Sequence, residues 1–489
     1  MIYYDKFMTL KKQIAHNTLI QLAGKILSTL LGLLTVFVMT RSLGVEKFGW
    51  YVTAVGFLQF IGIFSDFGFV ITTANMLSEP RFEQKKLLAT LFTWRFLTAL
   101  IFQGLAPLLF LFFPYPAEIK MAVTIISISF FAASITNVFT GYYQQQLKTY
   151  INTTGELIGR VFLLGGILLL AKLGATFLPM MGIITLASLF NASYLYYKMP
   201  KIHFCLDKEI SRAMFIKIWP TALCIIFNSF YLQGDRVILP LYASATDVAY
   251  YGASYRVLDI IIQMSALIMG IMAPLLAFTY SRSQTEDFKK RLQMAFDLVS
   301  LFLIPLMLGA IALATPIMRF VGGAEFTGAA KILTYLSFAI FGICFGMVFG
   351  YTALSINKQK QAIWIYFIDA ILSVIGYFIF IPSFGIYGAA GVTIFSEFFA
   401  GFCLMSLVYY HTKFIPQLKS LAKIFVAGLA MYFVITRLPT PHVLISIFIG
   451  GLLYGTLILI FKVISKNTIK EILPAQLSKI SFFDNIDNI

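Results

Sequence analysis

An acid and a base stand side by side in an apolar stretch of this 489-residue chain, at Asp235 and Arg236 in the run "YLQGDRVILP". Ionisable groups at bilayer depth are costly, and they usually face a protein interior or a water-filled region. Neighbours on a helix project about 100° apart, so we expect each side chain to find another partner or water. A structural network is favoured for Asp235. A place at the outer mouth of a cavity stays open for Arg236.

Further basic residues lie deep inside apolar segments, and they could bind an anion. Arg95 and Arg256 sit several residues inside their segments, and a guanidinium group can grip phosphate or carboxylate oxygens in pairs. For these two arginines we favour the lining of a cavity. Lys25 is similarly deep and is kept as a candidate substrate-binding residue, although snorkelling to the membrane surface is the simpler interpretation. Arg160 follows Glu156 by one helical turn, which predicts a local ion pair.

Acidic residues inside apolar segments could carry protons or cations, or could pair with arginines. Glu397, in "TIFSEFF", lies near the middle of its segment, where so short a side chain cannot reach the membrane surface. Asp369 and Asp66 are also internal, and Asp259 shares a helix face with Arg256 three residues earlier. We assign Glu397, Asp235, Asp259 and Asp369 to an ion-coupling or structural network, with Glu397 favoured for function.

The composition is that of a membrane protein. Hydrophobic residues make up 59% of the chain and charged residues only 12%, whereas soluble domains are nearer half apolar and a quarter charged. The four cysteines show no pairing pattern and the four histidines no metal-ligand spacing, so we expect no metal and no disulfide framework. No nucleotide-binding glycine-rich motif is present, and we expect no cofactor.

Apolar stretches near the 20 residues that a membrane-spanning helix needs recur along the chain. They predict an all-α polytopic fold with fourteen spans: 17–39, 50–75, 87–113, 121–142, 157–171, 177–197, 218–239, 248–279, 294–314, 332–354, 363–381, 386–409, 421–435 and 443–464.

The distribution of basic residues predicts the orientation. With the N-terminus in the cytoplasm, 25 Lys and Arg residues fall on or beside the inner connections and 7 on the outer ones. Basic residues concentrate on the cytoplasmic side of membrane proteins, so both termini are expected there. The same rule explains the net charge of +16 without any nucleic-acid partner.

A weak internal repeat suggests two related halves. The run "SLGVEKFGWYVTA" from Ser42 parallels "YASATDVAYYGAS" from Tyr242, and the offset of 200 residues spans six helices. An even number of helices gives both halves the same orientation, which is a transporter architecture. We therefore expect two six-helix lobes around a central cavity, at residues 1–212 and 213–412. Residues 413–489 would add two helices and a cytoplasmic tail.

Three stretches resemble a known family. "TRSLGVEKFGWYVTAVGFLQFIGIFSDFGF" and "DRVILPLYASATDVAYYGASYRVLD" are similar to signatures in the two halves of Wzx-type O-antigen flippases, within the MOP (MATE-like) superfamily. "NKQKQAIWIYFIDAILSVIGYFIFIPSFGIYGAAGVTIFSE" resembles a segment nearer the C-terminus of the same proteins.

This resemblance implies a non-enzymatic flippase in the bacterial inner membrane. Its substrate would be an undecaprenyl-pyrophosphate-linked oligosaccharide, such as a lipopolysaccharide O-antigen unit, moved to the periplasmic leaflet by alternating access. Its partners would be membrane lipids, the lipid-linked oligosaccharide, polysaccharide polymerase and chain-length machinery. The buried cations would then line the site of the pyrophosphate headgroup.

Rival functions remain. A peptidoglycan-precursor flippase would share the fold and an anionic lipid substrate. A MATE-type cation-coupled drug exporter is expected to carry an acid in its first helix, where this chain has Lys25. A membrane glycosyltransferase would need a large domain or long loop outside the membrane, and the predicted loops are short.

Overall fold

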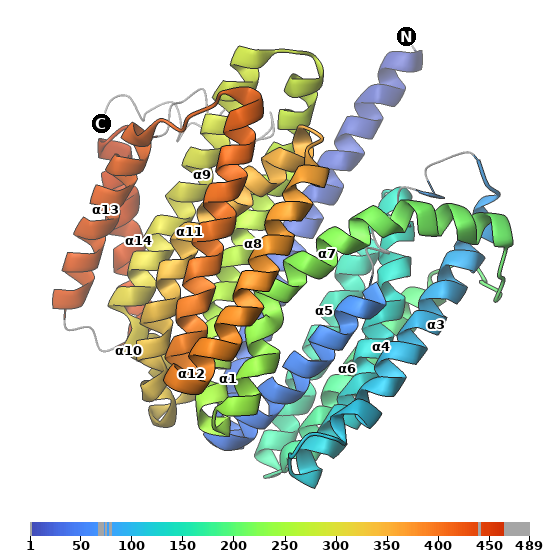
Figure 1. Cartoon of the computed structure of the whole chain (residues 1–489), viewed down its shortest axis with the longest axis horizontal. Coiled ribbons are helices and arrows are strands. Elements are labelled where there is room, and N and C mark those ends of the chain that lie inside the picture. The colour runs from blue at the N-terminus through green and yellow to red at the C-terminus, as the bar shows by residue number, and fades with distance from the viewer. Residues whose placement is uncertain (1, 67–72, 74–75, 78–80, 439–441, 464–489) are drawn as a thin grey trace. The chain divides into compact units, whose positions relative to one another are not determined.

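The computed structural model describes residues 2–66, 73, 76–77, 81–438 and 442–463. Within these residues all regular secondary structure is helical (Figure 1). The chain divides into two compact units, Met1–Ala249 and Tyr250–Ile489. The C-terminal tail, predicted to be cytoplasmic, lies outside the described residues.

The first unit holds six described helices. They are α1 (Ile2–Asp66), α3 (Gln84–Phe110), α4 (Ala117–Gln145), α5 (Thr149–Lys172), α6 (Phe177–Tyr197) and α7 (Lys208–Tyr242).

The second unit takes most of α8 (Ala245–Ser281), which begins at the end of the first unit. Its other helices are α9 (Thr285–Ala312), α10 (Ala314–Gly322), the 3-10 helix η1 (Ala324–Gly328), α11 (Ala329–Ser355), α12 (Gln359–Thr412), α13 (Leu418–Arg437) and α14 (Val443–Ile460).

Eleven of the described helical segments are long and apolar enough to cross a membrane. Two of them, α1 and α12, reverse direction at a glycine and so each hold two of the predicted spans (Figure 1). The seventh predicted span lies inside α7, which is 35 residues long. The all-α, multi-pass fold predicted from the sequence is therefore confirmed.

The reversals depend on glycine because their backbone angles exclude a side chain. Gly44 has φ 71° and ψ 176°, and Gly385 has φ 55° and ψ −133°, regions that are nearly restricted to glycine. Contacts across α12 confirm its hairpin: the hydroxyl groups of Tyr377 and Thr393 are 3.3 Å apart, and His411 Nε2 is 2.7 Å from Gln361 Oε1.

Helix ends differ from the sequence prediction where polar turns extend an apolar span. Helix α9 begins at Thr285, nine residues before the predicted start, and its first turn carries Glu286 and Asp287. Acidic residues are favourable at a helix N-terminus, so the helix continues beyond its apolar part. The short α10 was not predicted, because nine residues are too few for a spanning pattern to reveal.

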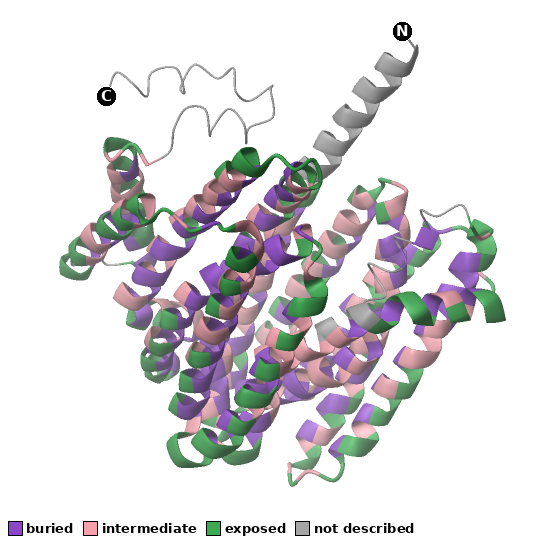
Figure 2. Ribbon diagram, turned by 45° about the horizontal axis from the view of Figure 1, so that its top comes forward, coloured by how far each residue is buried: buried purple, intermediate pink, exposed green. Residues whose placement is uncertain are grey.

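Helix α3 shows how one helix serves both membrane and core. Its exposed side carries large apolar residues, among them Leu100, Ile101 and Leu105, whereas Arg95 and Gln103 lie on its buried side. Figure 2 shows the same alternation of buried and exposed positions on the other helices. An apolar outer surface is the one that suits contact with lipid.

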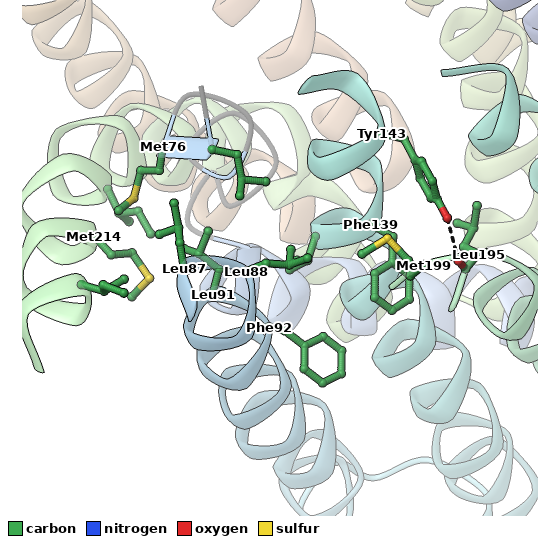
Figure 3. Close-up of a cluster of buried hydrophobic side chains, with 14 of the residues drawn as sticks. Met76, Leu87, Leu88, Leu91, Phe92, Phe139, Tyr143, Leu195, Met199 and Met214 are labelled. Carbon is green, nitrogen blue, oxygen red and sulfur yellow. Dashed lines mark hydrogen bonds between the residues drawn. The ribbon is translucent and has the colours of Figure 1, made fainter. Parts of the chain in front are cut away.

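A buried apolar cluster fixes the first half of α3 (Figure 3). Leu87, Leu88, Leu91 and Phe92 follow the spacing of one helix face and pack with residues of α4, α6 and α7. The Tyr143 hydroxyl, also in this cluster, donates a hydrogen bond of 3.0 Å to the Leu195 carbonyl. Because Arg95 lies one turn beyond Leu91, this packing also fixes the position of the arginine.

Candidate functional site

Arg95 lies in the interior of the first unit, and its side chain is only 1% exposed. Its Nε donates to the Ser134 carbonyl of α4 at 2.7 Å, and Nη1 donates to the Ser65 carbonyl of α1. Its Nη2 is 3.0 Å from Asp66 Oδ1. A buried guanidinium group requires such compensation, and here α1 and α4 supply it.

Asp66 connects this interior network to accessible space. Its Oδ1 accepts hydrogen bonds from Arg95 and from Asn137 Nδ2, the second at 2.9 Å. The Asp66 side chain is nevertheless 33% exposed, in contrast to Arg95. Donors on α3 and α4 thus hold one oxygen of the carboxylate, and part of the Asp66 side chain remains accessible.

Asp235 and Arg236 lie near the C-terminal end of α7, in the first unit. The buried Asp235 carboxylate accepts the Arg236 backbone N–H at 2.8 Å, and Arg236 Nη1 donates to Gln59 of α1 at 3.3 Å. This contact places Arg236 against the second half of α1. The close approach depends on Gly56, because a Cβ there would lie 2.9 Å from the Arg236 carbonyl oxygen.

Lys25 lies half-buried on the first half of α1, which packs against α5. One turn further along α1, Ser28 donates to Glu156 of α5 at 2.5 Å. Glu156 also pairs with Arg160 at 4.0 Å, which confirms the local ion pair predicted from their spacing.

In the second unit, Arg256 and Asp259 form the expected pair on α8. Arg256 Nη1 is 3.8 Å from Asp259 Oδ2, and the Arg256 side chain is 33% exposed. A separation of 3.8 Å is long for a hydrogen bond, so the pairing is loose. Among the four basic residues proposed from the sequence, Arg256 is therefore held much less tightly than Arg95.

Among the described residues of the second unit, two buried acids lie on opposite arms of the α12 hairpin. Both oxygens of Asp369 are 2.9 Å from the Ser396 hydroxyl, and Ser373 lies 3.5 Å away. Glu397, next to Ser396, is buried against α11, where Gly342 and Gly346 leave room for it. Ser396, which hydrogen-bonds Asp369, is the sequence neighbour of Glu397. The α12 hairpin therefore brings the two acids near each other.

Three polar residues that hydrogen-bond to carboxylates inside the spans were not identified from the sequence. Asn137, Ser396 and Ser373 each support an internal carboxylate, and their only sequence signal is a small polar residue inside an apolar span. Gln103 is a further case: its buried amide has no hydrogen-bond partner among the described residues. A polar residue inside a span is therefore a reasonable candidate for a site. The sequence alone does not show which residue it will contact.

The sequence predicts neither a disulfide framework nor a metal site. Cys205, Cys344 and Cys403 are free thiols, and the side chain of Cys224 lies outside the described part. Over the described residues, no group of three His, Cys, Asp or Glu side chains is arranged to hold a metal ion.

The fold is shared with transporters of lipids and drugs. The chain is similar to the lipid II flippase MurJ in its inward closed conformation, with a TM-score of 0.75 and 19% identity over 91% of this chain and 98% of that one. It is also similar to an inward-facing MATE multidrug transporter of the MOP superfamily. There the TM-score is 0.65 and the identity 14%, over 81% of this chain and 98% of that one.

The sequence family is more specific than the fold. Residues 38–331, more than half of the chain, match the polysaccharide biosynthesis protein family, and the chain belongs to this family. A curated relative is the probable low-salt glycan biosynthesis flippase Agl15 of Haloferax volcanii, 24% identical over 256 residues. That match covers 50% of this chain and 53% of Agl15, so it spans about half the length of the relative.

Proposed function

We propose that this protein is a flippase for undecaprenyl-pyrophosphate-linked oligosaccharides, such as O-antigen units. It would move them from the cytoplasmic to the periplasmic leaflet of a bacterial inner membrane by alternating access. One observation carries the proposal: a member of a polysaccharide biosynthesis family has, over 91% of its length, the fold of the lipid II flippase MurJ.

The proposed headgroup contacts are Arg256, Arg236 and Lys25. Arg256 is the leading candidate, because its side chain is partly exposed and its pairing with Asp259 is loose. A guanidinium group can release such a partner and bind two phosphate oxygens instead. Arg95 would first have to give up its three hydrogen bonds to α1 and α4, so we assign it the role of positioning Asp66.

Glu397 is the proposed coupling residue, and Asp369 its structural support. A buried carboxylate without a route to the membrane surface can bind a proton or cation as the protein changes conformation. The two hydrogen-bonding serines around Asp369 favour a fixed, structural role for that residue.

The proposal is tested by complementation in a strain that lacks its own O-antigen flippase. Expression of this chain should restore polysaccharide display at the cell surface. A null result with normal protein abundance, across strains with different repeat units, would refute the proposal.

The second candidate is a peptidoglycan-precursor flippase, which the likeness to MurJ favours. Depletion of the host lipid II flippase separates the two functions. Under the first proposal this chain does not rescue growth after that depletion, and under the second it does.

A further inference from the structure

Asp66 and Asn137 offer hydrogen-bond acceptors that the described residues of the first unit do not use. The two donors that reach Asp66, from Arg95 and Asn137, both bind its Oδ1. In the described part of the chain, neither Asp66 Oδ2 nor the amide oxygen of Asn137 has a hydrogen-bond donor. Two acceptor oxygens therefore stand close together on neighbouring helices.

The exposed part of Asp66 must open onto water. Asp66 lies sixteen residues into the predicted second span of 50–75, and its side chain is 33% exposed. A carboxylate is costly in the hydrocarbon region, and such residues face a protein interior or an aqueous space. The apolar exposed side of α3, by contrast, suits lipid.

The charge of the site restricts its ligand. Asp66 carries one negative charge and the adjoining buried Arg95 carries one positive charge, so together they are neutral. Free acceptors on a neutral pair suit uncharged donors, and hydroxyl groups are such donors. Three helices hold the groups in place before any ligand arrives, which favours specific recognition.

We infer that Asp66 and Asn137 form a recognition site for the hydroxyl groups of the sugar part of the lipid-linked substrate, with Arg95 as its positioning residue. This inference rests on the proposed function and adds to it, because the cations would bind the headgroup and this pair the glycan. Adjacent sugar hydroxyls would donate to Asp66 Oδ2 and to the Asn137 amide oxygen.

The variant Asp66→Asn tests this while keeping an acceptor for the donors of Arg95 and Asn137. Because it also removes the charge that balances the buried guanidinium group, its folding is checked by thermal denaturation beside the wild type. Two donors face Oδ1, so the asparagine oxygen must take that position and its NH₂ group the open one. The substitution therefore replaces an acceptor by a donor only at the accessible Oδ2 position. Asn137→Ala removes the second acceptor. Asn191→Ala is the matched control, because its amide oxygen faces Gly155 between α5 and α6.

The assay compares two kinds of probe on the full-length chain in lipid nanodiscs. One is undecaprenyl pyrophosphate, and the other is the same lipid bearing one hexose, N-acetylhexosamine or 6-deoxyhexose. The wild type should bind at least one sugar-bearing probe about tenfold more tightly than the bare lipid, which corresponds to about 1.4 kcal/mol. Asp66→Asn and Asn137→Ala should abolish that difference and leave the affinity for the bare lipid unchanged.

The outcomes separate this inference from the proposed function. If the wild type binds neither probe, the proposed function fails and the inference fails with it. If the wild type binds both probes equally, or the two variants keep the preference for sugar, only the inference is wrong. Equal loss of affinity for both probes would show that Asp66 and Asn137 have a structural role. Asn191→Ala should behave as the wild type throughout.

Discussion

Substitution of Gly49 should destabilise the first unit through a clash with the backbone. Gly49 lies on the second half of α1, and a Cβ placed there would collide with the carbonyl group of Ala245, whose carbon would be 2.7 Å away. Backbone atoms cannot rotate aside as a flexible side chain can. Gly56→Ala is a milder case on the same helix face, since its Cβ would lie 2.9 Å from the Arg236 carbonyl oxygen.

The expected magnitude follows from two opposing effects. An added methyl group in a tightly packed site typically destabilises by about 1–3 kcal/mol, whereas alanine is favoured over glycine in a helix by about 0.5–1 kcal/mol. Gly104→Ala on α3 isolates the second effect, because nothing lies within 4 Å of its Cβ position. Gly104→Ala should therefore be the most stable protein, followed by the wild type, Gly56→Ala and Gly49→Ala.

The assay is thermal denaturation of the four purified proteins in one detergent, followed by size-exclusion chromatography of heated samples. Domains of 150–250 residues lose about 2–4 °C in Tm per kcal/mol, so Gly49→Ala should melt several degrees below Gly104→Ala. Equal Tm values for these two variants would refute the close packing of α1 against the junction of α7 and α8.

Four further predictions concern topology, charge, coupling and a helix cap. A reporter active only in the periplasm should be bright when fused near Asp247 and dark at Ile489; a bright C-terminal fusion would contradict the predicted orientation. Arg256→Gln should lower surface polysaccharide at normal protein abundance, with partial recovery in Arg256→Lys, and wild-type display would exclude a role in substrate binding. Glu397→Gln should remove the dependence of transport on a proton or sodium gradient; a variant that keeps this dependence would exclude Glu397 as the coupling residue. Asp207→Ala should lower the Tm, because the carboxylate accepts the Ile210 backbone N–H and pairs with Lys86, and these contacts lower the pKa of Asp207. A lowered pKa means that the stabilisation is complete above the usual pKa of an aspartate, about 3.9, and is lost as the pH falls through the lower pKa of the folded protein, so the difference in Tm should vanish in strong acid.

The prediction from sequence was accurate where composition along the chain decides the structure. Apolar length located the spans, because lipid contact leaves few polar residues on a spanning helix. The i,i+4 pair of Glu156 and Arg160 and the i,i+3 pair of Arg256 and Asp259 were also predictable, since helix geometry alone brings such residues together.

The sequence was less informative where partners come from different helices. Arg95 was expected to line a cavity, and the structure places it among Ser65, Asp66 and Ser134. No local pattern shows that these residues are neighbours, because they are about 30 and 39 positions away along the chain. The same holds for Ser396 and Asp369, which meet only because α12 folds back on itself.

The sequence by itself determined that this is a multi-pass helical membrane protein, which residues lie inside its spans, and which of them are charged. These properties follow from local composition, since the hydrocarbon region excludes unpaired polar groups wherever they occur. Only the tertiary structure decided which charges are satisfied and which remain accessible. Arg95 and Asp66 are both ionisable residues inside spans, yet one is enclosed and the other partly open. That difference depends on how α1, α3 and α4 pack, because burial and hydrogen bonding are properties of neighbouring helices in space.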